Sequence, residues 1–314
     1  MGLVGLGIHG SRYGAHLSRG EPPGTELAAV WTRDPEKRSR AAERWQVTAS
    51  PSPEALVEAV DAVIVAVPVG LHLGLVEQIF ARGRALLLEK PMAMSSGEAR
   101  RMITLAGSNP FTIAQTLRFD PLLLELQKAA RRPEFGRLVG FAFEQRLEPR
   151  DVEWEDDPAR SGGGVLMQTG IHGLDALRFV TGAERVEVDG YRGRRIAYEN
   201  GEDDARVDLV LGGGAAASGE ARGWIVTSKL GCSRHHRFQL FFERGGLEAD
   251  FIDRRLYSTV GRDRAALEVP AAPTLVHTLD AFARFLRKEI PNPVPPEEGL
   301  EAVRLVEAAY ARST

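Results

Sequence analysis

Cysteine is nearly absent from this chain of 314 residues, which contains only Cys232. A single thiol cannot form an internal disulfide, and it cannot supply the several thiolates that a structural zinc site or an iron–sulfur cluster requires. Disulfide scaffolds and thiolate metal centres are therefore excluded. We expect a protein of the reducing cytoplasm, and the N-terminal sequence MGLVGLGIHG agrees because it lacks the basic and apolar regions of a secretory signal.

Long apolar runs and an excess of positive charge are missing as well. The longest apolar stretches, such as residues 62–69, fall far short of the roughly 20 residues that a helix needs to cross a bilayer. Forty basic residues stand against 43 acidic ones, and the net charge of -3 provides no positive field for nucleic-acid phosphates. We therefore expect neither a membrane nor a nucleic acid as a partner.

The first third of the sequence alternates short apolar runs with helical patterns, as βαβ units do. The predicted strands are apolar throughout, which indicates that helices cover both faces of the sheet; they span residues 2–5, 27–32, 62–67 and 85–88. Helices are predicted over 34–45, with Asp34 as N-cap and Pro35 as the first residue, and over 71–82, with Gly83 as C-cap. This pattern predicts a doubly wound parallel α/β domain over residues 1–113.

The pattern changes in the remaining residues, 114–314. Three runs alternate apolar and polar side chains, so that one face of each strand is exposed or forms an interface; they are residues 138–147, 204–211 and 236–243. Glycine-rich turns at 212–214 and 244–246 predict hairpins between such strands. Helical patterns occupy 164–180, 275–288 and 296–312. We expect a second, α+β domain with a mostly antiparallel open sheet.

Residues Gly5–Gly10 read G-x-G-x-x-G between the first strand and the first helix. At this place Gly5 permits a tight turn, Gly7 lets the backbone approach a pyrophosphate, and Gly10 allows close packing of helix on strand. The N–H groups at the helix N-terminus, around Ile8 and His9, would then face the phosphates. The motif predicts a dinucleotide cofactor.

The end of the second predicted strand indicates which dinucleotide is bound. An acidic residue about 20 positions after the glycines is typical of NAD-binding sites, because it accepts a hydrogen bond from the ribose. Here the strand ends in Thr32 and Arg33, and a hydroxyl with a guanidinium suits a 2′-phosphate, so NADP(H) is favoured over NAD(H). The alternative makes Arg33 a solvated residue and Asp34 the ribose partner, which the N-cap role of Asp34 weakens.

Lys90 follows the fourth predicted strand directly, in the sequence Glu89-Lys90-Pro91. The chain has only five lysines against 35 arginines. Ligands bind at the carboxyl ends of strands in such sheets, and a lysine can exchange a proton where an arginine cannot. The alternative is an ordinary loop lysine beside a turn proline.

A triple glycine precedes the helix predicted over 164–180, where it would provide a flexible entry. On an α-helix Gln168, His172 and Asp175 fall at i, i+4 and i+7 and would share one face. The alternative is a partly buried histidine that Asp175 simply holds. Metal binding is not expected, because Gln168 is a poor ligand and the sequence offers no further ligand at suitable spacing.

These motifs occur in one fixed order, together with Val67-Pro68 followed by His72 and with the sequence RFDP at 118–121. As an ordered set they resemble the Gfo/Idh/MocA oxidoreductase family over nearly the whole chain. The resemblance implies an N-terminal Rossmann domain for NAD(P) and a C-terminal domain whose open sheet commonly joins copies, hence a homodimer or homotetramer. It also implies a small sugar, polyol or related hydroxy or keto substrate.

The resemblance further implies roles for single residues. Lys90 is similar to the lysine that exchanges a proton with the substrate oxygen, and His172 to the histidine that assists it, so we expect the two to converge on one pocket. Hydride transfer at a carbon needs such a proton partner. The resemblance and the low cost of cis X-Pro bonds together predict a cis peptide between Lys90 and Pro91. Cofactor contacts are also expected from Pro68, His72 and Glu89, and substrate contacts from Gln168, Arg118, Trp154 and Asp175.

One position departs from the family pattern. Gln168 stands where members with inositol-type chemistry usually have an aspartate, and a glutamine can donate and accept hydrogen bonds but cannot accept a proton. Either Lys90 and His172 suffice, or the substrate differs. The departure also leaves room for a dinucleotide-binding regulator without turnover. A third reading is an NAD-dependent glycosidase, which the Thr32-Arg33 pair disfavours.

Overall fold

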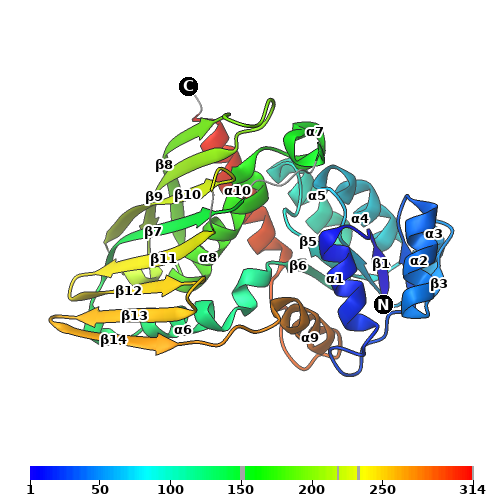
Figure 1. Cartoon of the computed structure of the whole chain (residues 1–314), viewed down its shortest axis with the longest axis horizontal. Helices are drawn as coiled ribbons and strands as arrows, with labels where there is room; N and C mark the ends of the chain where they lie inside the picture. Colours follow the sequence, from blue (N-terminus) through cyan, green and yellow to red (C-terminus); the bar gives the residue numbers. More distant parts are fainter. Residues whose placement is uncertain (149–152, 218, 232–233, 313–314) are drawn as a thin grey trace. The chain divides into compact units, whose positions relative to one another are not determined.

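The computed structural model describes residues 1–148, 153–217, 219–231 and 234–312, without the side chains of residues 153 and 154. Figure 1 shows the helices and strands along the chain, which divides into two compact units. The first unit comprises Met1–Thr116 and Pro273–Glu301, and the second comprises Leu117–Ala272 and Ala302–Thr314.

A six-stranded parallel sheet forms the centre of the first unit, in the order β3-β2-β1-β4-β5-β6. Its strands are β1 Gly2–Val4, β2 Ala29–Trp31, β3 Thr48–Ala49, β4 Ala62–Val65, β5 Ala85–Glu89 and β6 Phe111–Ala114. All residues of β4, β5 and β6 are buried, which explains why those runs lack polar alternation. The order is that of a Rossmann sheet, so the predicted doubly wound domain is confirmed, with β3 and β6 added.

Helices of the first unit begin and end where local signals place them. They are α1 Ile8–Leu17, α2 Pro35–Trp45, α3 Pro53–Glu58, α4 His72–Ala81, α5 Ser96–Ala106 and α9 Thr274–Leu286. Asp34 caps α2 by accepting a hydrogen bond from the Lys37 N–H at 3.0 Å, as predicted. Gly83 follows α4 with a positive φ of 64°, as predicted for a C-cap.

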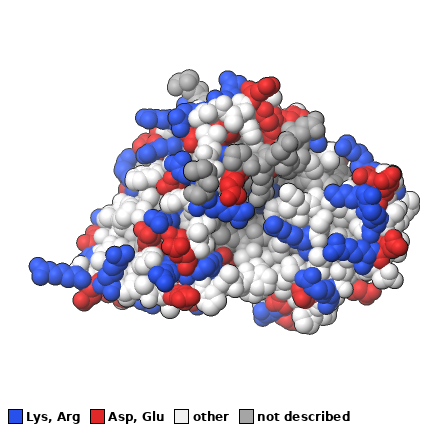
Figure 2. Space-filling view, viewed as in Figure 1, with Lys and Arg blue, Asp and Glu red and all other residues white. Residues whose placement is uncertain are grey.

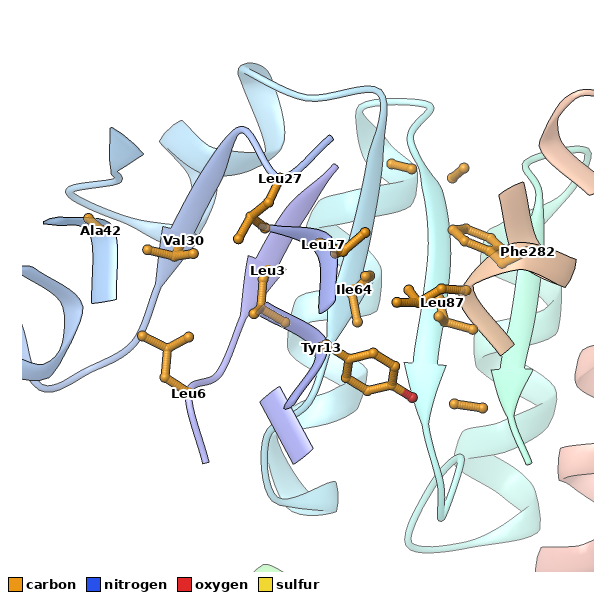
Figure 3. Packing of buried hydrophobic residues seen from close by; sticks show 14 residues of the cluster. Leu3, Leu6, Tyr13, Leu17, Leu27, Val30, Ala42, Ile64, Leu87 and Phe282 are labelled. Atoms are coloured by element: carbon orange, nitrogen blue, oxygen red, sulfur yellow. The ribbon is translucent and has the colours of Figure 1, made fainter. Parts of the chain in front are cut away.

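The core of the first unit includes a helix that the sequence assigned to the second domain. Phe282 and Leu279 of α9 are fully buried in one cluster with Leu3, Ile64 and Leu87 of the sheet (Figure 3). The apolar face of α9 packs against the sheet of the first unit. Residues 273–301 therefore belong to the first unit rather than to a domain running from 114 to 314. The boundary at Glu301 falls within the last helix, α10 (Pro296–Tyr310).

The described part of the second unit contains an eight-stranded sheet in the order β14-β13-β12-β11-β7-β10-β9-β8. Its strands are β7 Leu138–Arg146, β8 Arg185–Arg194, β9 Asp204–Gly212, β10 Glu220–Ser228, β11 His235–Phe242, β12 Gly245–Asp250, β13 Arg255–Val260 and β14 Asp263–Glu268. The predicted hairpins β9–β10 and β11–β12 are present. Within this sheet β7 and β10 are the only described neighbours that pair in parallel, so the mostly antiparallel sheet is confirmed.

Two helices, α6 (Pro121–Ala130) and α8 (Ile171–Thr181), pack on each other and on this sheet. The large side chains of Trp224 and Phe241 on the sheet stay 38% and 42% exposed. Figure 2 shows both acidic and basic residues on the described part of the face that it displays. No helix among the described residues has the length and apolar character needed to span a bilayer.

Candidate active site

The glycine turn is closely packed at Gly5 and Gly10 and open at Gly7. Gly5 has a φ of +96°, and a Cβ added there would lie 2.3 Å from the Ala66 carbonyl oxygen. A Cβ added to Gly10 would lie 1.9 Å from the Gly5 carbonyl oxygen, whereas one on Gly7 would have nothing within 4 Å. Gly7 is the exposed N-cap of α1 and provides no side-chain cap to the helix N–H groups. An open cradle therefore faces the start of α1, around Ile8 and His9.

Beyond the glycine turn, β2 leads to the residues predicted to select the dinucleotide. Thr32 is half-buried and Arg33 is exposed. The carboxylate of Asp34 is engaged as the cap of α2, and the hydrogen bond from the Lys37 N–H lowers the pKa of Asp34. Arg38, which was not predicted, donates from Nη1 to the Thr32 carbonyl oxygen at 3.3 Å. The sequence feature that could have identified it is a second arginine one helical turn after the start of α2.

Glu89 ties the end of β5 to the first helix. Its carboxylate is 6% exposed and accepts a hydrogen bond from the Tyr13 hydroxyl at 2.8 Å. Nδ1 of His9 lies 4.0 Å from the same oxygen, and the Lys90 N–H donates to the other oxygen at 3.2 Å. Burial and the nearby charge of Glu89 raise the pKa of Tyr13. The loop that carries Lys90 is thereby fixed to the helix that begins at the glycine turn.

His72 joins the loop after β4 to the loop after β5. The side chain is fully buried, with Nε2 3.0 Å from the Val67 carbonyl oxygen and Nδ1 3.2 Å from the Met92 carbonyl oxygen. Burial lowers the pKa of His72, and a neutral imidazole donates from one nitrogen only. The peptide bond between Lys90 and Pro91 is cis, which confirms that prediction.

The loops just described lie at one edge of the first unit's sheet. Strands β1, β4 and β5 are neighbours, so the segments that follow them meet at the carboxyl edge. These segments are Gly5–Gly10, the 3₁₀ turn Val69–Leu71 that follows Pro68, and Glu89–Met92. The predicted cofactor residues of the glycine turn and Lys90 thus share the edge where ligands bind in such sheets.

In the second unit, Arg118 and Asp175 form a bidentate ion pair. Nε and Nη2 of Arg118 donate to the two carboxylate oxygens at 2.9 and 2.6 Å, and the side chains are only 8% and 1% exposed. The Arg118 guanidinium also lies 5.0 Å from the centre of the Phe179 ring. The pair connects the 3₁₀ turn Thr116–Phe119 with α8, and both residues were predicted as substrate contacts.

The helix predicted over 164–180 is not a continuous α-helix. Residues Leu166–Gly170 form a π-turn, and α8 begins at Ile171, so Gln168 and His172 are not related by regular α-helical spacing. The regular α-helical spacing assumed for that shared face is therefore interrupted, and the shared face itself stays a prediction. The triple glycine is also close-packed rather than simply flexible, because a Cβ on Gly164 would lie 2.2 Å from the Glu202 carbonyl oxygen. His172 remains half-buried in the first turn of α8.

Gln168 belongs to a polar cluster that the sequence did not reveal. Its amide nitrogen donates to the carbonyl oxygens of Glu155 and Gly163 at 2.5 and 3.0 Å, and its amide oxygen accepts from the Lys229 ammonium. The scarcity of lysine that singled out Lys90 applies equally to Lys229, which was the available signal. The predicted substrate contact Trp154 has a side chain outside the described residues.

Two family models match this chain. One is described as "Oxidoreductase family, NAD-binding Rossmann fold" and matches residues 1–114; the other is the "GFO/IDH/MocA C-terminal domain" and matches residues 123–248. The chain belongs to the Gfo/Idh/MocA family of oxidoreductases. The resemblance seen in the ordered motifs is thereby confirmed, as is the nucleotide-binding character of the Rossmann domain.

Several relatives with assigned names are similar to this chain over more than half of its length. The UDP-N-acetylglucosamine 3-dehydrogenase of Acidithiobacillus ferrooxidans is 26% identical over 282 residues, which is 87% of this chain and 79% of the relative. The inositol 2-dehydrogenase 4 of Saccharopolyspora erythraea is 29% identical over 59% of this chain and 54% of its own. The solved aldose-aldose oxidoreductase of Caulobacter crescentus superposes with a TM-score of 0.88 at 23% identity, over 99% of this chain and 96% of that one. This last similarity confirms the fold.

Proposed function

We propose that this oxidoreductase is an NAD(P)-dependent dehydrogenase or reductase that interconverts a hydroxyl and a carbonyl group on a sugar, a polyol or a related compound. The observation that carries the proposal is the placement of Lys90 at the carboxyl edge of the Rossmann sheet, next to an open glycine cradle and connected to α1 through Glu89. The names of the relatives, a sugar-nucleotide dehydrogenase and an inositol dehydrogenase, support the same substrate class.

The residues at this edge fit a dinucleotide. The open space above Gly7 and the N–H groups at the start of α1 would hold the pyrophosphate, and Arg33 with Arg38 would hold a 2′-phosphate, so we propose NADP(H) in preference to NAD(H). The bound nicotinamide supplies the hydride acceptor or donor. His72 and Glu89 fix the loops at the nicotinamide end by contacts to the backbone and to α1.

Proton exchange falls to the side chains of the protein. When a hydride leaves or reaches a carbinol carbon, a proton must leave or reach its oxygen. We assign that transfer to the Lys90 amine, whose backbone is held by Glu89, and assistance to His172 at the start of α8. The convergence of these two residues on one substrate oxygen stays a prediction of the proposal.

We also propose that copies of this protein associate with one another. The outer face of the eight-stranded sheet keeps Trp224 and Phe241 exposed, in keeping with a homodimer or homotetramer formed through that sheet. Light scattering of the purified protein at several concentrations measures the mass directly.

A cofactor and substrate panel tests the proposal. Binding of NADPH and NADH is measured first by fluorescence, and hydride transfer is then followed at the nicotinamide absorbance with sugar nucleotides, inositols and aldoses. Lys90→Met keeps the bulk of the side chain but removes the proton donor, so turnover falls by roughly 10²–10⁴ while NADPH affinity is unchanged. Lys128→Met is the matched control, because Lys128 lies on the surface of α6 with Glu125.

Distinct outcomes separate the proposal from its rivals. A fully active Lys90→Met enzyme contradicts the assigned role of Lys90. NADPH binding without turnover on any compound of the panel favours the dinucleotide-binding regulator. Turnover of a glycoside with no net change in the cofactor favours the NAD-dependent glycosidase instead.

A further inference from the structure

A buried ionic cluster lies in the second unit, among groups that the proposed mechanism does not use. Lys229, directly after β10, is 5% exposed, and its ammonium donates to the carboxylate of Glu155. The same ammonium donates to the side-chain oxygen of Gln168 and, at 3.1 Å, to the hydroxyl of Tyr198. A buried lysine with three specified acceptors requires an explanation, because removing an ammonium from water is costly.

Of the acceptors just named, Glu155 alone carries a charge. Lys229 carries one positive charge and Glu155 one negative charge, and the amide of Gln168 is neutral. Burial and the nearby Glu155 raise the pKa of Tyr198, so its hydroxyl remains neutral as well. A carboxylate at position 168 would put a second negative charge next to the buried Glu155 carboxylate, which low polarity disfavours.

Two further carboxylates near Tyr198 accept hydrogen bonds from the backbone of the loop that carries it. Asp203, fully buried, accepts hydrogen bonds from the backbone N–H groups of residues 196–198. Asp156 accepts from the N–H groups of residues 199–201. Both acids therefore hold the loop in place and leave Glu155 as the carboxylate that pairs with Lys229.

The cluster is attached to the segment that leads to His172. Gln168 lies in the middle of the π-turn Leu166–Gly170, and its amide nitrogen bonds the backbone on the side of Glu155 and Gly163. Glu202 holds the start of the same turn, since its carboxylate accepts from the Leu166 N–H at 3.0 Å. The π-turn passes into α8 at Ile171, one residue before His172. A change in the turn would therefore rotate the imidazole.

We propose that Gln168 is a positioning residue that, together with the Lys229–Glu155 ion pair, fixes the π-turn and thereby the orientation of His172, and that a neutral amide suits position 168 because Glu155 already supplies a carboxylate to Lys229. This inference rests on the proposed function of His172. In this arrangement Gln168 acts through His172 and not by contact with substrate.

The first experiment exchanges charges inside the cluster. Gln168→Asp adds a negative charge, so its midpoint of urea unfolding should drop at pH 8 and recover towards pH 5, where the added acid is protonated. Adding Glu155→Gln to that variant leaves a single carboxylate on Lys229 and should restore the midpoint at pH 8. Gln127→Asp is the matched control, because Gln127 also donates to a backbone carbonyl oxygen of α8, that of Phe179, which lies outside the cluster.

The second experiment measures His172 itself. The chain has seven histidines, so the ¹³Cε1 resonance of His172 can be assigned by comparison with a His172→Asn spectrum. Gln168→Asp, and the neutral pair Lys229→Met with Glu155→Gln, should each change the resonance position and shift its titration midpoint by about half a pH unit or more. Gln127→Asp should leave the resonance in place, since a general loss of stability does not move it.

Either of two results overturns the inference. One is a midpoint of urea unfolding at pH 8 that is the same for Gln168→Asp as for the parent protein, or that stays low when Glu155→Gln is added to Gln168→Asp. The other is an unchanged His172 resonance in both cluster variants. These readouts need no substrate, so an inactive substrate panel would contradict the proposed function while leaving the positioning of His172 measurable.

Discussion

The two glycines of the cradle predict opposite effects of the same substitution. Gly10→Ala places a methyl group 1.9 Å from the Gly5 carbonyl oxygen. That oxygen is a backbone atom, so it cannot move aside without moving the turn. The turn must open, at a cost of about 3 kcal/mol in the free energy of unfolding, as for other forced overpacking. For a unit of this size that corresponds to a fall in Tm of roughly 10 °C.

Gly7→Ala adds a methyl group to open space instead. The backbone of Gly7, at φ -68° and ψ -165°, is accessible to alanine, and nothing lies within 4 Å of the added carbon. Alanine lowers the entropy of the unfolded chain, which stabilises the fold, but it is a poorer N-cap residue than glycine, which destabilises it. Because the two effects oppose each other, the free energy of unfolding should change by less than about 1 kcal/mol. The methyl group occupies the approach of the pyrophosphate, and NADPH affinity should fall at least about tenfold, or 1.4 kcal/mol.

Thermal unfolding and fluorescence titration with NADPH, applied to both variants, test this reasoning. The expected pattern is a destabilised Gly10→Ala protein and a Gly7→Ala protein that is stable but binds weakly. Equal losses of stability in the two variants would refute the assignment of the open face to the cofactor. Unchanged NADPH affinity in Gly7→Ala would refute it as well.

Three further predictions concern single side chains. Asp175→Asn removes the carboxylate that pairs with the buried guanidinium of Arg118 and should cost about 3–5 kcal/mol in urea unfolding, most of which the double replacement Arg118→Met, Asp175→Leu should recover. Arg33→Ala should weaken NADPH binding several-fold and leave NADH binding unchanged; equal losses for both cofactors would contradict the 2′-phosphate contact. Burial lowers the pKa of His236 to about 4, so its neutral form stabilises the fold above pH 6.5, and about 3 kcal/mol is lost as the pH falls from 6.5 to 4. His236→Leu should flatten that part of the stability profile, while His277→Leu, at an exposed site, should not.

Local signals were sufficient for much of the first unit. The N-cap at Asp34 and the positive φ at Gly83 each depend on neighbouring residues, and the structure contains both. The cis bond before Pro91 was predicted with the help of the family resemblance, and it is present as well. The glycine turn was equally visible, because its spacing and its place after a strand are both local. β3 escaped because Thr48–Ala49 is only two residues long and exposed, with no apolar run to reveal it.

Features built by distant residues could not be predicted in the same way. Lys229 meets Glu155 and Gln168 across 74 and 61 positions of the sequence. The spacing of Gln168 and His172 reads the same for a π-turn as for an α-helix, so the turn left no periodic signal. The apolar stripe of α9 indicated a buried helix but not which of the two cores would receive it.

The position of β7 in the middle of its sheet imposes an order on folding. β7 ends at Arg146, yet its two neighbours begin only at Glu220 and His235. At a synthesis rate of about 5–20 residues per second, both edges of β7 remain unpaired for several seconds while the chain is made. The fully buried rings of Phe141 and Phe143 lie on this strand and would be exposed meanwhile. The second unit therefore closes late, and until then it exposes the apolar surface and unpaired strand edges that favour aggregation.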